Sequence, residues 1–142
     1  EKKETGYERV TESDIYFCAN SRGYVETTCE DCYDVDDEYY ESANYYSDKT
    51  VAENNARADK LMRQLRRFAV EHRKCGVNFN NTNTKKYHIY YDCDNDKLGV
   101  SWVFCSKGFG AIYFDLEETS QAAIYEFHDE LIWYFTEYKD SL

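Results

Sequence analysis

Residues 87–104 read YHIYYDCDNDKLGVSWVF, and this stretch decides the fold. Apolar and polar side chains alternate on both sides of Asp94-Asn95-Asp96, which predicts two antiparallel strands joined by a tight turn. The apolar positions are Tyr87, Ile89, Tyr91 and Cys93 on one strand and Leu98, Val100, Trp102 and Phe104 on the next. A tight turn places both sets on one face of the sheet, which we expect to be the core face.

The neighbouring segments extend this hairpin into a larger antiparallel sheet. A second turn at Ser106-Lys107-Gly108 leads to a third predicted strand over residues 111–114. Nearer the start of the chain, the apolar runs 15–18 and 23–28 flank a segment with turn chemistry, so they predict another β-hairpin.

Two long helices are predicted beside the sheet. Thr50-x-x-Glu53 is a capping box, and apolar residues then recur at three- and four-residue spacing until Gly76 ends the helix. That stripe is Ala58, Leu61, Leu65, Phe68 and His72. Asp115-x-x-Glu118 caps a second helix, which extends to about Tyr138. The expected fold class is α+β, with an antiparallel β-sheet packed against two long α-helices and stabilised by disulfides.

A chain of 142 residues is long enough for one domain with a hydrophobic core, so residues 1–142 are predicted to form a single domain. The charged residues 1–12 are expected to be flexible. Residues 29–49 are rich in Asp, Glu and Tyr with poor periodicity, and they are expected to form an acidic loop.

Six cysteines at irregular spacing predict a disulfide framework and therefore a secreted protein. They are Cys18, Cys29, Cys32, Cys75, Cys93 and Cys105. The strand faces above direct Cys93 inward and Cys105 outward, so these two are not expected to bond each other, and the remaining pairings stay open. The chain starts at Glu1 without a Met, which is consistent with a removed signal peptide.

The net charge of −11 argues against nucleic-acid binding, because such binding requires that phosphates be neutralised. Runs without a charged residue, such as 98–106, are about nine or ten residues long and too short to cross a membrane. We therefore expect no membrane insertion and no nucleic-acid partner.

Cys29-x-x-Cys32 also has the spacing of zinc and redox motifs. A tetrahedral zinc site usually needs a second such pair, which the chain lacks, and an acidic loop disfavours a reactive thiolate, so structural disulfides are favoured. The acidic tract lacks the glycine of a calcium-binding EF-hand loop. We expect no metal and no cofactor.

No catalytic residue is assigned, and the chain is not expected to be an enzyme. His88 shares a predicted strand face with Tyr90 and Asp92, as acid–base groups would in a ribonuclease-like sheet. A solvent-facing strand side chain is the favoured interpretation of His88. The other histidines, His72 and His128, fall in predicted helices as packing or surface residues.

The candidate partner-binding residues lie on the basic face of the first helix and in the Tyr-rich segment. Tyr supplies contact area at low entropic cost, and clustered cations attract acidic groups. The candidates are Arg57, Lys60, Arg63, Arg67, Tyr39 and Tyr40. For the basic face, partial neutralisation by the chain's own acids is the favoured interpretation, and binding of an anionic group is the alternative.

Tyr16-Phe17-Cys18, together with the order hairpin, helix, meander, resembles the Tyr-x-Cys signature and ribonuclease-like scaffold of small secreted effectors of plant-pathogenic fungi. The resemblance implies that Cys18 bridges to a late cysteine, of which Cys105 is the last, and that the scaffold acts as a binder without catalytic residues. The acidic segment and the second helix depart from that pattern. A cysteine-stabilised α/β sandwich like those of fungal killer toxins is equally admissible.

The leading hypothesis is a secreted, non-enzymatic effector of virulence type that binds a host macromolecule, with a host protein or receptor as partner. It would act outside the cell or after delivery into host tissue. The alternatives are a secreted ribonuclease-like hydrolase that uses His88, a killer-toxin-like protein, and a secreted ligand-binding protein of animal saliva or venom.

Overall fold

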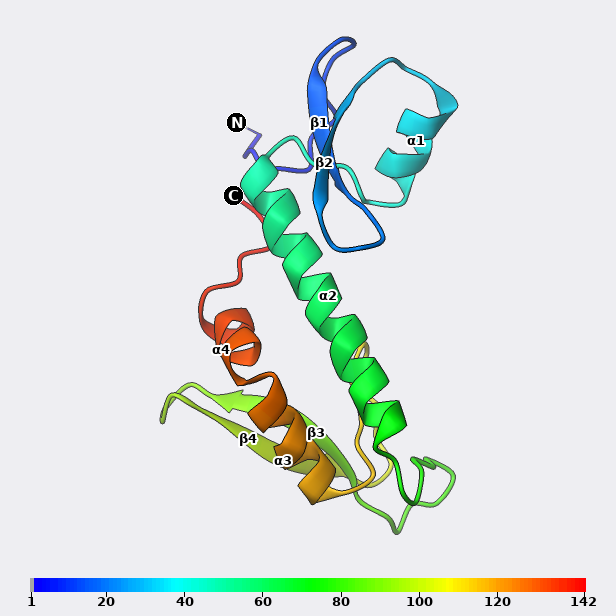
Figure 1. Ribbon diagram of the computed structural model, residues 1–142, viewed down its shortest axis with the longest axis vertical. Coiled ribbons are helices and arrows are strands. Elements are labelled where there is room, and N and C mark those ends of the chain that lie inside the picture. Colours follow the sequence, from blue (N-terminus) through cyan, green and yellow to red (C-terminus); the bar gives the residue numbers. More distant parts are fainter. Residues whose placement is uncertain (1) are drawn as a thin grey trace. The chain divides into compact units, whose positions relative to one another are not determined.

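The computed structural model describes residues 2–142 (Figure 1). Within this range, four helices and four strands form a mixed α and β structure whose contacts divide it into two compact units. The first unit holds the described residues up to Lys60 together with Tyr138–Leu142, and the second unit holds Leu61–Glu137.

The first unit contains the predicted early hairpin. It is formed by β1 (Ile15–Ala19) and β2 (Val25–Cys29), which pair antiparallel. At the turn, the side-chain oxygen of Asn20 accepts the backbone N–H groups of Arg22 and Tyr24 at 2.9 and 3.1 Å. Such Asx bonds stabilise tight turns, so the turn chemistry read from the sequence is confirmed here.

A short helix, α1 (Asp34–Glu41), lies where the sequence predicts an acidic loop over residues 29–49. One carboxylate oxygen of Asp36 accepts the backbone N–H groups of Asp31 and Tyr33, both at 3.1 Å, and fixes the entry into the helix. Acidic residues in the first turn also complement the helix dipole. The loop prediction is therefore wrong for residues 34–41. The buried carboxylate of Asp36 stabilises the start of this helix, and such a contact cannot be recognised from the periodicity of the sequence.

Tyrosines and carboxylates fill much of the first unit. The rings of Tyr16 and Tyr45 stack with centroids 3.9 Å apart, and neither residue is more than 1% exposed. The hydroxyl of Tyr16 donates to Asp36 at 2.6 Å, and that of Tyr45 donates to Glu30 at 2.9 Å. Arg9 adds a 2.7 Å ion pair to Glu30. The buried carboxylates are thus hydrogen-bonded, as buried polar groups must be.

The residues predicted to be flexible, 1–12, make specific contacts where they are described, and Glu1 lies outside the described residues. The carbonyl of Gly6 accepts the N–H of Ser47 at 2.9 Å. Gly6 has a φ of +93°, and a Cβ placed on it would lie 2.8 Å from the side chain of Val51. Both the backbone conformation and the close approach require glycine at this position.

The longest helix, α2 (Lys49–Glu71), confirms the first predicted helix but differs at both ends. Asp48, rather than Thr50, caps it, since its side-chain oxygen accepts the N–H of Val51 at 2.9 Å. The helix also ends several residues before Gly76. The buried members of the predicted stripe are Ala58, Leu61 and Leu65.

The second unit contains the hairpin of residues 87–104. Its strands are β3 (Lys86–Asp92) and β4 (Lys97–Val103), and Ile89 lies directly opposite Val100. Tyr87 and Tyr91 likewise face Trp102 and Leu98, so the predicted pairing of the two apolar sets is confirmed. The core does not extend to the end of β4, where Trp102 and Phe104 remain 49% and 42% exposed.

The predicted third strand shrinks to one bridge, in which Phe114 exchanges backbone hydrogen bonds with Tyr87 at 2.8 and 2.9 Å. Within residues 2–142 there are two separate two-stranded sheets, β1–β2 and β3–β4. The prediction of one sheet packed against two long helices is therefore wrong.

The second long helix of the prediction is divided into α3 (Glu117–Glu126) and α4 (His128–Thr136). Between them, Phe127 has φ −110° and ψ 24°, outside the helical region. Its N–H still reaches the carbonyl of Ala123, and its carbonyl accepts the N–H of Leu131, both at 2.9 Å. The bend therefore leaves these two backbone hydrogen bonds intact.

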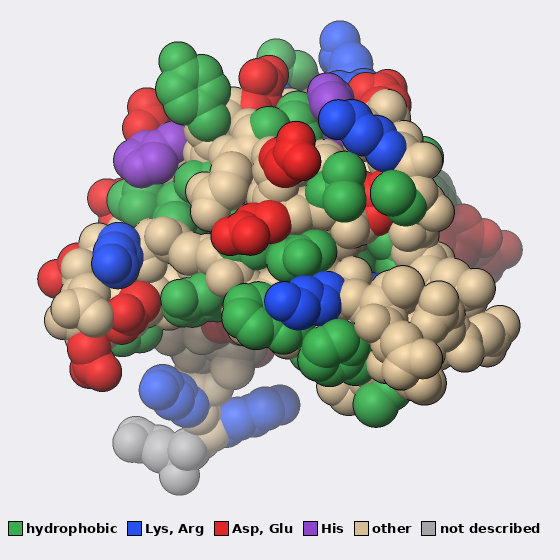
Figure 2. Space-filling model, turned by 90° about the horizontal axis from the view of Figure 1, so that it is seen from below, with side chains coloured by type: hydrophobic (Ala, Val, Ile, Leu, Met, Phe, Trp, Pro, Cys, Tyr) green, Lys and Arg blue, Asp and Glu red, His purple; other side chains and the backbone are tan. Residues whose placement is uncertain are grey.

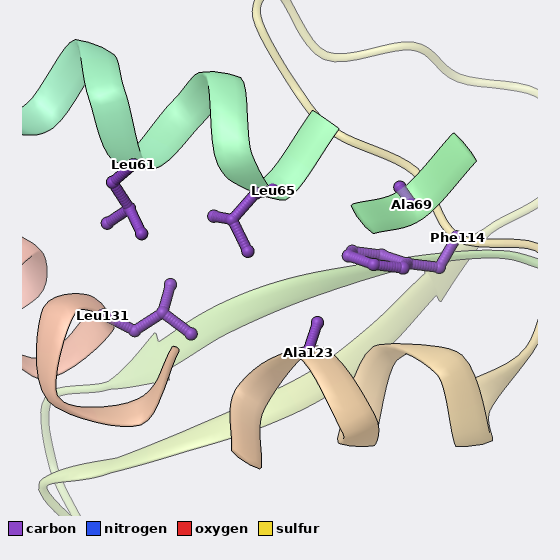
Figure 3. Packing of buried hydrophobic residues seen from close by; sticks show 6 residues of the cluster. All are labelled: Leu61, Leu65, Ala69, Phe114, Ala123 and Leu131. Atoms are coloured by element: carbon purple, nitrogen blue, oxygen red, sulfur yellow. The ribbon is translucent and has the colours of Figure 1, made fainter. Parts of the chain in front are cut away.

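The core of the second unit consists of Leu61, Leu65, Ala69, Phe114, Ala123 and Leu131 (Figure 3). Helix α3 contacts both strands of the hairpin (Figure 1).

None of the helices in the described part of the chain is long and apolar enough to span a membrane.

Candidate functional site

A surface hollow of about 380 Å³ in the second unit is lined by three cationic side chains. Arg66 belongs to α2, Arg73 follows that helix, and Lys107 lies in the loop after β4. All three residues are exposed, and none forms an ion pair with a carboxylate of the described residues. We call this surface the basic hollow. Its other lining residues are Ala69, Val77, Phe79, Gly108, Ala111, Ile112 and Tyr113.

Aromatic rings form one wall of the basic hollow. The rings of Phe79 and Tyr113 meet edge to face, with centroids 5.0 Å apart. The ammonium groups of Lys86 and Lys107 lie 5.1 and 4.9 Å from the Phe79 centroid, within the range of cation–π attraction. The N–H of Gly108 donates to the Tyr113 hydroxyl at 2.6 Å, which positions the loop that carries Lys107.

Lys86 is 1% exposed and joins two segments beside the hollow. Its ammonium donates to the backbone carbonyls of Asn81 and Phe104, both at 2.5 Å. An ammonium is costly to bury unless its protons are hydrogen-bonded, and these carbonyls meet that need. Lys86 therefore has a positioning role, since it fixes the loop before β3 to the end of β4.

Asp115 fixes the backbone of residues 74–76, which follow Arg73 along the chain. Its Oδ2 accepts the backbone N–H groups of Lys74, Cys75 and Gly76, at 2.7, 2.7 and 3.2 Å. Burial opposes ionisation of Asp115, but these donated bonds outweigh it and hold the pKa below its ordinary value. The predicted capping role of Asp115 is wrong, because the N-cap of α3 is Leu116 and the carboxylate is used here instead.

Charge is divided unequally between the units. The second unit has nine Lys and Arg against eleven Asp and Glu, a net charge of −2, whereas the rest of the chain has eight against seventeen, a net charge of −9. The overall charge of −11 therefore conceals a nearly neutral unit in which a basic hollow can attract an anion.

Large apolar patches do not dominate the surface in Figure 2. On the face drawn there, the hydrophobic side chains of the described residues are interspersed with acidic and basic ones. Broad apolar patches are the usual mark of stable protein interfaces. The face drawn in Figure 2 does not show that mark.

The predicted partner-binding residues do not form one surface within either unit. Arg57 and Lys60 belong to the first unit, and Arg63 and Arg67 belong to the second. Tyr39 and Tyr40 take part in packing in the first unit. The Tyr39 ring lies 6.3 Å from that of Tyr16, and the guanidinium of Arg9 lies 5.3 Å from the centre of the Tyr40 ring.

The six cysteines are unpaired throughout residues 2–142, so the predicted three disulfides are not part of this fold. Cys18 is 1% exposed, with its sulfur 3.8 Å from the hydroxyl of Thr28, and the other five cysteines are exposed. Burial raises the pKa of the Cys18 thiol.

The positions of the cysteines limit which of them could pair. Cys93 follows β3 and Cys105 follows β4, so the antiparallel register places them at opposite ends of the hairpin. Three cysteines fall in each unit, so bonds within the units cannot pair all six.

The histidines form no acid–base pair with a buried carboxylate among the described residues. The ring of His88 lies edge to face with Tyr113, with centroids 6.3 Å apart. His72 stacks on Phe68, and exposed His128 contacts the neighbouring Asp129. No titratable side chain lies within hydrogen-bond distance of the His88 ring in the described structure.

Sequence reasoning missed Phe79, Lys107 and Tyr113, of which the last two lie more than thirty residues beyond the end of α2. Arg66 and Arg73 were visible as basic residues flanking the helix face, and their seven-residue separation with Ala69 between them was a usable signal. Lys107 reads as a turn residue, and only the folded loop brings it to the hollow.

Within residues 2–142, no group of three or more His, Cys, Asp and Glu side chains is placed to hold a metal ion. Comparisons of the chain with protein-family models, curated proteins and solved structures find no match.

Proposed function

We propose that this chain is a secreted, non-enzymatic binding protein of effector type, whose second unit binds an acidic segment of a host protein in the basic hollow. The observation that carries the proposal is the set of three cations, Arg66, Arg73 and Lys107, that line one hollow without carboxylate partners among the described residues. Guanidinium groups bind carboxylates through paired hydrogen bonds, so two arginines in one hollow favour such a ligand.

The size and charge of the chain favour a short acidic segment over a long polyanion. A hollow of about 380 Å³ accommodates a few side chains, and its three cations neutralise only a few charges. The net charge of −11 repels an extended polyanion such as nucleic acid. The aromatic wall formed by Phe79 and Tyr113 adds apolar contact area at a rigid surface.

A fluorescently labelled glutamate-rich peptide tests the binding role by fluorescence anisotropy. Two exposed ion pairs are worth about 1–2 kcal/mol together, so Arg66→Glu with Arg73→Glu should weaken binding about tenfold or more. Binding to the unaltered protein should also weaken as salt rises.

The matched control is Arg67→Glu, which introduces the same kind of charge change next to Arg66 but outside the hollow. We expect a far smaller effect from this variant. If Arg67→Glu weakens binding as much as Arg66→Glu does, or if the unaltered protein does not bind the peptide, the basic hollow is not the site.

A further measurement tests the non-enzymatic part of the proposal. RNA cleavage that is present in the unaltered protein and absent in His88→Ala would favour the ribonuclease-like alternative over binding alone.

A further inference from the structure

The second unit also contains an apolar cavity of about 170 Å³. It is open to solvent on one side, where exposed Gly110 and Phe135 line it. Its inner end reaches the core, where Leu61 and Leu65 of α2 point toward Leu131 of α4 (Figure 3). Phe114 lies at the same core, and these four residues are at most 6% exposed. All the residues that line the cavity belong to the second unit.

Most of the side chains that line this cavity are apolar. Ile89 and Ile112 line it from β3 and from the segment that pairs with β3. His88 and Tyr134 are the polar side chains among the described residues that line it. None of the described residues that line the cavity is an acid, a lysine or an arginine.

The volume of the cavity indicates the size of its ligand. Protein interiors are close-packed, and voids larger than one water molecule are few. An apolar cavity of about 150 Å³ is known to stay dry and to bind benzene, whereas pockets for drug-sized ligands measure about 300–1,000 Å³. A cavity of about 170 Å³ therefore has room for one small ring.

We propose that this cavity is a binding site for a small, uncharged, single-ring apolar compound of the size of benzene. Ala111 and Ile112 line both this cavity and the basic hollow, but the two differ in chemistry, because only the hollow is lined by Lys and Arg. The inference does not depend on the proposed function, and either can fail without the other. A defect in packing without a ligand role is the competing explanation.

Methyl NMR titration of the whole chain with benzene tests the proposal. We expect saturable shifts of the methyl signals of Leu61, Leu65 and Leu131, because these side chains line the cavity. Benzoate carries the same ring with a charge, and burying that charge is costly, so benzoate should not produce those shifts. Arg66→Ala with Arg73→Ala should leave benzene binding unchanged.

The variant Leu131→Phe fills the cavity and should weaken benzene binding by more than about tenfold, since even one methylene in an apolar pocket changes affinity by that order. The matched control is Ile132→Phe, which makes the same kind of change at the next residue of α4 and does not line the cavity. Leu131→Ala enlarges the cavity and should retain or strengthen binding.

Absence of saturable methyl shifts in the unaltered protein would overturn the proposal and leave a packing defect. Equal weakening by Leu131→Phe and Ile132→Phe would also overturn it. If Leu131→Phe fails to fold, Leu131→Ala decides the question, because loss of benzene binding in that folded variant contradicts the site and retention supports it.

Discussion

In the first unit, two tyrosine rings stack on each other and donate hydrogen bonds from their hydroxyls to buried carboxylates, whereas in the second unit leucine, alanine and phenylalanine form the core. Tyr16 and Tyr45 each direct a hydroxyl to a particular carboxylate, so their positions are fixed by direction as well as by shape. Leu61 and Leu131 have no such constraint. A hydrogen-bonded core specifies one arrangement, and a hydrocarbon core tolerates several.

This difference parallels the division of charge. The unit with the carboxylate-based core also carries most of the net negative charge, and the nearly neutral unit carries the basic hollow and the apolar cavity. We infer that the first unit is the more sensitive to pH, and that the second unit depends mainly on the burial of apolar side chains. Three perturbations test this contrast.

The largest effect is expected from Phe114→Ala in the second unit. Phe114 is 1% exposed in the core and bridges to β3, so removal of its ring should lower the free energy of unfolding by about 3–5 kcal/mol. Urea denaturation measures the loss, and hydrogen exchange of the β3–β4 peptides localises it. The control is Phe109→Ala, at a fully exposed position of the adjoining loop, with an expected change within about 0.5 kcal/mol. A similar loss in both variants would contradict the assigned core.

A smaller effect is expected from Tyr45→Phe in the first unit. The change keeps the stacked ring but removes the hydroxyl that donates to Glu30 and accepts the N–H of Val10. We expect a loss of about 1–3 kcal/mol, because a buried group is left without its partner. Tyr24→Phe, at a position 64% exposed, is the control and should be nearly neutral. If Tyr45→Phe is also neutral, the hydroxyl network does not stabilise the first unit.

The third effect is a loss of stability in acid. The hydrogen bond from Arg9 lowers the pKa of Glu30, and that from Tyr16 lowers the pKa of Asp36. Each carboxylate therefore stabilises the folded state above its unfolded pKa of about 4, and this stability is lost as the pH falls through the folded pKa. Urea denaturation at pH 6 and at pH 3 should show the decline, and Glu30→Gln should make it shallower. An unchanged slope would mean that Glu30 does not contribute.

Much of the local structure follows from the sequence pattern alone. The pairing of residues 87–104 was predictable because alternation and a turn of Asp and Asn residues leave one register that keeps the apolar side chains together. Helix α2 was predictable because its apolar stripe recurs over many turns.

The features that escape prediction depend on contacts between distant residues. Helix α1 depends on Asp36, whose carboxylate is buried beneath Tyr16, and nothing in the local pattern separates it from the solvated acids beside it. The cap at Asp48 competes with an equally good motif at Thr50. The basic hollow joins Arg66 and Arg73 to Lys107, some thirty-four residues further along the chain, through a loop that carries no regular period.

The two isolated bridges have a consequence for solubility. They lie at Phe17 of β1 and at Tyr87 of β3, so within residues 2–142 the outer edges of β2 and β4 have no partner strand. Open edges are templates for pairing between molecules, and charged side chains are the common protection. The sequence of β2 includes Glu26, whereas β4 has Lys97 only at its first residue and then runs through Val100 and Trp102. Near the isoelectric pH of about 4.7, where repulsion between molecules vanishes, β4 is the segment through which the chains would aggregate.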